Sequence, residues 1–132
     1  ATSSFITGPD ATEFEITMSK FVGSKDCAST GSGTTALLCA MRAANIGPGD
    51  EVITTPHTFV ATTEAIVSVG AIPVFVDIDQ FYHMDINQLQ YTDGMKAILF
   101  VDLYGQTPDI DKIKSFAKKN NLVVISLQSC YD

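Results

Sequence analysis

The residues Ser32-Gly33-Thr34-Thr35 form a loop of small side chains between an expected strand at residues 27–30 and an expected helix from Ala36. The first backbone N–H groups of a helix have no carbonyl partner within the helix, and the positive end of the helix dipole lies beside them. Such a loop suits a phosphate group, although a tight turn with an ordinary helix cap would use the same residue types. The chain has neither a Walker loop nor a G-x-G-x-x-G fingerprint, so binding of ATP or NAD is not expected.

Three further loops follow expected strands, at the end of an open parallel sheet where ligands bind. Phe59 could stack on a flat heterocycle there, but an ordinary core aromatic is the plainer interpretation. His57 is most simply a loop histidine, and the residue types of Tyr104-Gly105-Gln106 do not decide whether that loop faces the same crevice. Asp77 and Asp79 have no third ligand in their turn, so they are expected to form the turn itself, and no metal site is predicted.

The elements that must position these loops are helices that alternate with short strands rich in β-branched residues. Strands are expected at residues 51–54, 73–76, 96–101 and 122–125. Thr12-x-x-Glu15 has the form of a capping box in an amphipathic helix that ends at Gly23, and Thr107 and Pro108 are expected to open the last helix. This alternation predicts a three-layer α/β/α fold with a mostly parallel sheet, in one incomplete domain that spans residues 1–132.

The charge balance and the cysteines narrow the partners and the compartment. Eight Lys and Arg against 15 Asp and Glu give a net charge of −7, which would repel a phosphate backbone, so nucleic acid is not an expected partner. Cys27, Cys39 and Cys130 have neither metal-site nor disulfide spacing and are expected to be buried, reduced thiols. No apolar run approaches the length of a membrane span, and no secretory leader pattern is present, so a cytoplasmic protein without membrane contacts is expected.

Five segments occur in an order and at spacings that point to one protein family. They are Ser32–Leu37, Gly47–Ile53, Thr58–Thr62, Gly70–Asp79 and Leu103–Gln106. Together they closely resemble the DegT/DnrJ/EryC1/StrS family of sugar aminotransferases, which belong to fold type I of the pyridoxal-phosphate (PLP) enzymes. Phe5-Ile6-Thr7-Gly8-Pro9 also resembles the opening segment of that family. Members are usually much longer, so the chain is expected to be the front part of such an enzyme.

The resemblance implies cofactor-binding roles for four residues. In such enzymes the backbone amides at the positions of Thr34 and Thr35 hold the PLP phosphate, and the aromatic at the position of Phe59 stacks on the pyridine ring. The family then has a strand-end Glu-Asp-Ala-Ala-Gln, where this chain reads Ser-Leu-Gln from Ser126. If two residues are missing there, Gln128 corresponds to the family Gln. The Asp that would keep the pyridine nitrogen protonated then has no counterpart.

No residue of this chain is implied to be catalytic. The Schiff-base lysine of the family is expected beyond Asp132. The lysines of the last helix are expected to form its solvated face and end: Lys112, Lys114, Lys118 and Lys119.

The resemblance implies a PLP-dependent aminotransferase that transfers the amine of a glutamate-like donor to a nucleotide-linked keto-sugar. A PLP-dependent sugar dehydratase is an alternative, because the lysine position that separates the two activities is not in this chain. An alternative of a different class is that the chain is a non-catalytic piece, either truncated or kept as an interaction module. The missing Asp and Lys favour this alternative. Transaminase turnover by this chain alone would argue against that interpretation. A homodimer or other self-association is expected, because the family's active site lies between two subunits and an incomplete sheet exposes an edge strand.

Overall fold

The computed structural model describes residues 8–128 of the 132-residue chain. The chain divides after Ala36 into two compact units, and the division falls inside one helix. The resemblance at Phe5-Ile6-Thr7 and the prediction for Cys130 lie outside the described residues. Within the described part of the chain, no helix has both the length and the apolar character needed to cross a membrane.

The first unit begins with helix α1, Pro9–Val22, which confirms the predicted helix. Pro9 lies in the first turn, where its missing N–H costs no hydrogen bond, and Gly23 ends the helix with a left-handed φ of 69°. The predicted capping box is wrong, because the helix begins at Pro9 and Thr12 lies inside it. The apolar side chains of α1 are exposed, and Phe21 most of all, at 84%.

Residues 27–30 contain no strand, contrary to the prediction. Ser29 gives the physical reason, since its backbone N–H and its hydroxyl both donate to Oε1 of Glu15, at 2.7 and 2.6 Å. A carboxylate therefore takes the N–H that a β-ladder would have used. The hydrogen bond from the Ser29 hydroxyl, followed by the one from its backbone N–H, lowers the pKa of Glu15.

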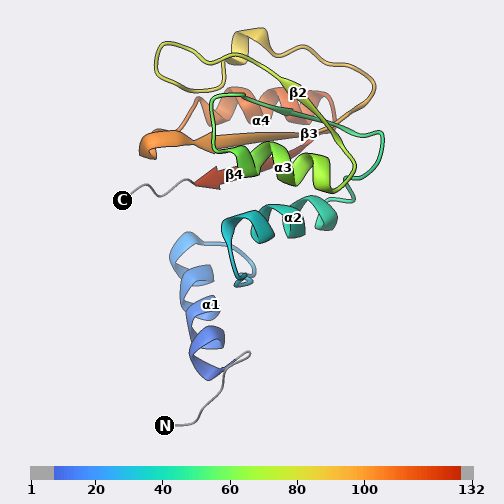
Figure 1. The fold of residues 1–132 in the computed structure, drawn as a ribbon. Coiled ribbons are helices and arrows are strands. Elements are labelled where there is room, and N and C mark those ends of the chain that lie inside the picture. The colour runs from blue at the N-terminus through green and yellow to red at the C-terminus, as the bar shows by residue number, and fades with distance from the viewer. Residues whose placement is uncertain (1–7, 129–132) are drawn as a thin grey trace. The chain divides into compact units, whose positions relative to one another are not determined.

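The second unit is built on a four-stranded sheet in which each strand is parallel to its neighbours. The strands are β1 (Glu51–Thr54), β2 (Ile72–Phe75), β3 (Met95–Asp102) and β4 (Val123–Gln128). They lie side by side in the order β2-β1-β3-β4 (Figure 1). The four strands predicted over residues 51–125 are confirmed, although β4 runs on to Gln128 and β2 begins one residue earlier than expected.

After α1, the described residues form three longer helices and two single-turn 3₁₀ helices, which flank these strands. They are α2 (Gly33–Ala43), α3 (Val60–Ser68), α4 (Ile110–Lys119) and the 3₁₀ helices η1 (Ile86–Gln88) and η2 (Leu103–Gly105). The predicted start of α4 at Thr107 and Pro108 is wrong. Asp109 caps this helix instead, because its carboxylate accepts the backbone N–H of Lys112 at 3.1 Å.

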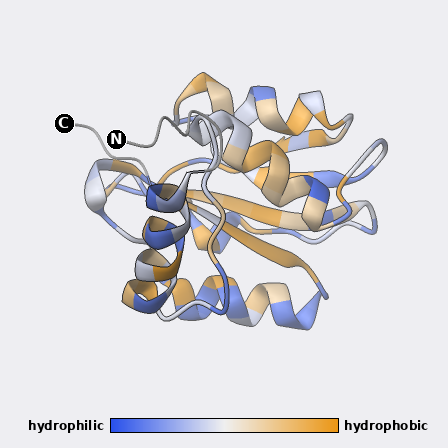
Figure 2. Ribbon diagram, turned by 90° about the horizontal axis from the view of Figure 1, so that it is seen from below, coloured by the Kyte–Doolittle hydropathy of each residue, from blue (hydrophilic) through white to orange (hydrophobic). Residues whose placement is uncertain are grey.

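Successive strand residues alternate between two apolar layers, one on each face of the sheet. On one face Val52 and Leu99 pack with α3 and with the part of α2 that belongs to this unit. On the other face Ile53 and Ile98 pack with α4. Figure 2 shows the hydrophobic colour that runs along the strands between these helices. The arrangement confirms the predicted three-layer α/β/α fold with a parallel sheet.

The two cysteines within the described residues are free thiols, as expected. Cys27 is half-buried and Cys39 is exposed. The expectation that the cysteines are buried is therefore wrong for Cys39, which lies on the outer face of α2, while Leu37 and Met41 lie on its buried face.

Candidate functional site

The N-terminus of α2 carries the amides that were predicted to hold a phosphate. Ser32 precedes it, and Ser32 Oγ accepts the N–H of Thr35 at 3.2 Å. The backbone bond from Ala36 N–H to Ser32 C=O, at 3.0 Å, is the first of the helix. The N–H groups of Gly33 and Thr34 therefore have no carbonyl acceptor within the helix. This helix end has the donors for an anion, although the Thr35 donor is already engaged by Ser32.

Phe59 lies directly before α3 and forms its N-cap position. Its carbonyl accepts the N–H of Thr62 at 3.0 Å, which starts the helix. The side chain is 61% exposed, so the plainer expectation of a core aromatic is wrong. Because the loop from Thr55 to Phe59 follows β1, an exposed aromatic ring lies at the ligand-binding end of the sheet.

Gln128 is the last residue of β4, where it pairs in register with Asp102, the last residue of β3. Gln128 is exposed, whereas Asp102 is buried. The hydroxyl of Ser126 donates to Oδ2 of Asp102 at 3.2 Å, and Oδ1 of Asp102 is buried without a hydrogen-bond partner. Both strands therefore end in polar side chains at the carboxyl edge of the sheet.

Three aromatic side chains meet at this edge, each from the loop after a different strand: His57 after β1, Tyr82 after β2 and Tyr104 after β3. The rings of His57 and Tyr82 are stacked with centroids 5.4 Å apart. Tyr104 lies edge-on to Tyr82 at 5.9 Å and tilted to His57 at 6.5 Å. A cavity of about 280 Å³ opens beside them and is lined by Pro56, His57, Thr58, Leu103 and Tyr104.

The sequence did not reveal this cluster. His57 and Tyr104 were noted as loop residues after strands, but Tyr82 carried no signal of its own. Its neighbours in space are remote in the sequence, and the strand order that brings the three loops together is not encoded in any local pattern. A tyrosine that closely follows two turn-forming Asp residues after a strand is the only sequence feature that could have marked it.

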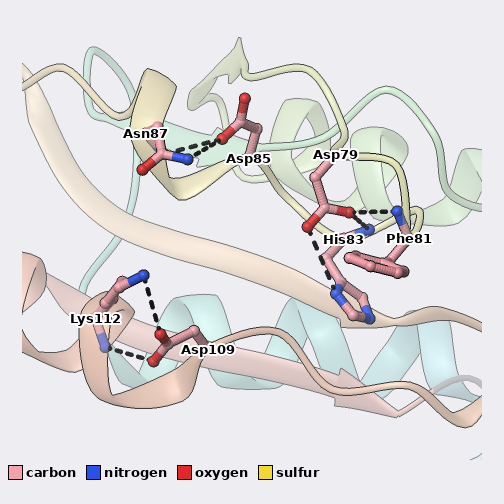
Figure 3. A network of polar contacts seen from close by, with 7 residues as sticks. All are labelled: Asp79, Phe81, His83, Asp85, Asn87, Asp109 and Lys112. Carbon is pink, nitrogen blue, oxygen red and sulfur yellow. Dashed lines mark hydrogen bonds and ion pairs between the residues drawn. The ribbon is translucent and has the colours of Figure 1, made fainter.

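Asp79 organises the loop that carries Tyr82 (Figure 3). Its Oδ1 accepts the backbone N–H groups of Phe81 and His83, at 2.8 and 3.0 Å, and its Oδ2 lies 3.8 Å from Nδ1 of His83. Asp79 therefore forms a turn, as predicted. Across residues 8–128 no group of three His, Cys, Asp or Glu side chains is arranged to hold a metal ion.

Two further carboxylates in Figure 3 cap helices. Hydrogen bonds from the Gln88 side chain and then from the Asn87 backbone lower the pKa of Asp85 at the start of η1. The backbone N–H of Lys112 is the main cause that lowers the pKa of Asp109 at the start of α4. The negative charge of each stabilises the helix end that it caps.

A family model, described as the DegT/DnrJ/EryC1/StrS aminotransferase family, matches residues 1–127. The chain belongs to this family. The family match contains Thr34, Thr35 and Phe59, and it ends one residue before Gln128. The family role of Gln128 therefore stays a prediction, as do the roles of the other three.

Several similar proteins are named as sugar aminotransferases. The UDP-2-acetamido-2-deoxy-3-oxo-D-glucuronate aminotransferase of Pseudomonas aeruginosa is 46% identical over 124 residues, which cover 92% of this chain and 34% of that protein. The UDP-N-acetyl-3-dehydro-alpha-D-glucosamine 3-aminotransferase of Acidithiobacillus ferrooxidans is 44% identical over 126 residues, which cover 93% of this chain and 34% of that protein.

A solved structure shares the fold. NtdA from Bacillus subtilis, crystallised with bound cofactor PMP, superposes with a TM-score of 0.92 at 34% sequence identity, over 95% of this chain and 29% of NtdA. The chain thus spans about a third of the length of the relatives that it matches.

The lysines of α4 lie where the sequence placed them. All four are exposed on that helix: Lys112, Lys114, Lys118 and Lys119. Lys112 forms an ion pair with Asp109 at 3.3 Å, between two side chains that are both well exposed. These lysines form the solvated face of α4, as predicted.

Proposed function

We propose that this chain forms the cofactor-binding part of a PLP-dependent aminotransferase that acts on nucleotide-linked keto-sugars with a glutamate-like amino donor. The observation that carries the proposal is the family match over residues 1–127, together with relatives that are named as aminotransferases of UDP-linked oxo-sugars. In this proposal residues 1–132 are a segment of one large PLP-binding domain, in a protein of the cytoplasm.

The residues present fit the chemistry of the cofactor. PLP combines a phosphate with a flat pyridine ring, so it needs anion-binding donors and an aromatic face. The amides of Thr34 and Thr35, at the N-terminus of a helix of 11 residues, are donors of the required kind. The exposed ring of Phe59 offers the aromatic face.

Each residue has a defined role in the proposal. Thr34 and Thr35 donate their backbone N–H groups to phosphate oxygens and so fix the cofactor at one end. Phe59 covers one face of the ring and keeps water from it, and the side-chain amide of Gln128 donates a hydrogen bond to a polar group on the ring. The cofactor, when bound, supplies an electron sink for the bond cleavage of transamination.

Equilibrium dialysis of the 132-residue chain against PLP and against pyridoxal tests the phosphate site. Pyridoxal has the same ring without the phosphate, so it should bind much more weakly if the α2 amides hold the phosphate. Phe59→Ala should weaken PLP binding several-fold, because aromatic stacking contributes about 0.5–1.5 kcal/mol. Phe81→Ala is the matched control, since Phe81 is exposed to a similar degree in another loop, at 57%. Equal binding of PLP and pyridoxal would contradict the proposal.

We also propose that the chain associates with a second copy of itself. Its support is the apolar surface of α1, where Phe14, Phe21 and Val22 are each more than half exposed. Edge strand β2 adds Ile72 and Phe75, each 51% exposed. Light scattering at rising concentration should show dimers, and Phe21→Ser should shift the equilibrium toward monomers more than Tyr91→Ser does. A monomer at every concentration would refute the association.

A further inference from the structure

The loop that leads into α2 is tied to α1 by one carboxylate. Oε1 of Glu15 accepts the backbone N–H of Ser29 at 2.7 Å and the hydroxyl of the same residue at 2.6 Å. These hydrogen bonds lower the pKa of Glu15, so its side chain is ionised near neutral pH. Hydrogen bonds to an ionised acceptor are stronger than those between neutral groups. The contact therefore fixes the backbone and the side chain of Ser29 together.

Beyond Ser29 the loop is held by its own side chains. The hydroxyl of Thr30 donates to the carbonyl of Ser32 at 3.0 Å. The same carbonyl accepts the N–H of Ala36 at 3.0 Å, in the first turn of α2. A series of contacts thus runs from Glu15 on α1 through the loop to the start of α2, and all of it lies within the first compact unit.

Packing leaves this loop free at its two glycines. Among the described residues, a Cβ added at Gly31 or at Gly33 would meet no atom within 4 Å, apart from the chain neighbours and the backbone of α2. Glycine has the widest backbone freedom of all residues, so a loop with two unpacked glycines needs another restraint to keep one conformation. The hydrogen bonds supply this restraint, and Glu15 is the member of the network that lies outside the loop.

The open space at Gly33 lies beside the free donors of α2. The N–H groups of Gly33 and Thr34 have no acceptor within the helix, so an anion that enters this space can bind them. A loop that moves can fill the same space, because the hydroxyls of Ser29 and Thr30 are themselves acceptors. A loop that is fixed beforehand keeps the donors available and lowers the entropy cost of binding.

We infer that Glu15 is a positioning residue for the cofactor phosphate, because its carboxylate fixes Ser29 and so keeps the loop clear of the first amides of α2. The inference rests on the proposed function, since it adds a residue of α1 to the phosphate site proposed at α2. In this role Glu15 acts through Ser29 and does not itself contact the phosphate.

Charge and position predict opposite outcomes for Glu15. A carboxylate near an anion site repels the anion, so removal of its charge alone should strengthen the binding of PLP. Loss of the contact with Ser29 should weaken it, because a mobile loop must be ordered when the ligand binds. Glu13 provides the matched charge control, since it is an exposed carboxylate on the same helix, whereas both Ser29 donors bind Glu15.

Equilibrium dialysis of the 132-residue chain and its variants against PLP and against pyridoxal tests the inference. Glu15→Ala should weaken PLP binding about fivefold, as expected from ordering roughly one more side chain on binding. It should leave the binding of pyridoxal unchanged, because pyridoxal has no phosphate. Glu15→Gln keeps an acceptor oxygen without the charge and should restore part of the loss. Glu13→Gln should leave PLP binding unchanged or strengthen it.

Ser29→Ala gives a second measurement if Glu15→Ala does not fold. It removes the hydroxyl and keeps the backbone N–H that donates to Glu15, so PLP binding should weaken by less than in Glu15→Ala. The double variant should bind PLP no more weakly than Glu15→Ala alone, because the hydroxyl has then already lost its acceptor.

Three results would overturn the inference and leave the proposed phosphate site standing. They are stronger PLP binding by both Glu15→Ala and Glu13→Gln, equal weakening of PLP and pyridoxal binding by Glu15→Ala, and unchanged PLP binding by both Glu15→Gln and Ser29→Ala. The first would mean that charge alone acts, and the second would mark a general loss of structure. Equal binding of PLP and pyridoxal by the unmodified chain would instead refute the phosphate site and the positioning role together.

Discussion

The hydroxyl oxygen of Ser32 lies 3.2 Å from the backbone nitrogen of Thr35 and accepts its hydrogen bond. The helix end proposed to bind a phosphate is therefore capped by a side chain of the same chain. A phosphate that uses the Thr35 amide must displace this hydroxyl or share the N–H with it. An internal acceptor and an external anion compete for one donor.

Ser32→Ala is expected to have opposite effects on stability and on binding. Loss of the cap should lower the free energy of unfolding by about 1 kcal/mol, because Thr35 loses its acceptor. PLP should bind several-fold more tightly, because the Thr35 N–H no longer has to break a hydrogen bond to the Ser32 hydroxyl before it binds the phosphate. Urea denaturation and equilibrium dialysis measure the two effects. Ser24→Ala is the control, since Ser24 Oγ donates to the carbonyl of Asp26 at 2.9 Å outside any helix start. Weaker PLP binding by Ser32→Ala would show that the hydroxyl itself contacts the phosphate.

The contact between Glu15 and Ser29 should weaken in acid. Its hydrogen bonds lower the pKa of Glu15 below the ordinary value of 4.5, so their stabilisation is fully present above pH 4.5 and is lost as the pH falls through the lowered value. An NMR titration should show the Ser29 amide shifting with the Glu15 carboxyl, and Glu15→Gln should remove that transition. Glu13→Gln, an exposed change on the same helix, should leave it in place. A Glu15 that titrates at 4.5 or above would contradict the contact.

The centre of β3 should dominate the stability of the sheet. Ile98 is fully buried between β1 and β4, at 0% exposure, so Ile98→Ala should lower the free energy of unfolding by about 2–5 kcal/mol. Val67→Ala is the control, since Val67 is 57% exposed on α3 and its truncation should cost about 0.5 kcal/mol or less. If the two variants had the same denaturation midpoint, the result would argue against the assigned layer structure.

The sequence predicted the sheet well because each strand carries its own signal. The run from Ala97 to Val101 is continuously apolar, as strands covered on both faces are, and β3 contains it. Errors arose where a single side-chain hydrogen bond decided the local structure. Residues 27–30 have the composition of a strand, but the carboxylate of Glu15 takes the Ser29 N–H. Likewise Asp109 caps α4 in place of Thr107.

The roles of the candidate site residues stay predictions, and only the local features behind them could be read from the sequence. The amides at Thr34 and Thr35 follow from a local rule about helix starts, and α2 begins at Gly33. Phe59 was placed in the correct loop, but its residue type left open whether the ring is exposed for stacking or buried in the core, because a lone aromatic after a strand has no pattern that separates the two. The meeting of His57 with Tyr82 depends on strand order, which no window of the sequence contains.

At Gly70 two of the segments that carry the family resemblance pack against each other. It has φ +83°, and a Cβ placed on it would lie 2.9 Å from Cγ of Pro48. The Gly47-Pro48-Gly49 turn and the Gly70 turn are therefore packed against each other too closely for a side chain. This close approach accounts for the glycine at position 70 by packing.

Gly70→Ala should consequently destabilise the chain more than Gly49→Ala does. Gly49 has a similar φ of +88°, but no atom lies within 4 Å of a Cβ added there. Both substitutions incur the left-handed backbone penalty of about 1–2 kcal/mol, and only Gly70→Ala adds a clash with a proline ring. Urea denaturation of the two variants isolates the clash, because the backbone term is common to both. Equal losses would mean that Pro48 moves aside freely and that the close approach of the two turns does not constrain residue 70.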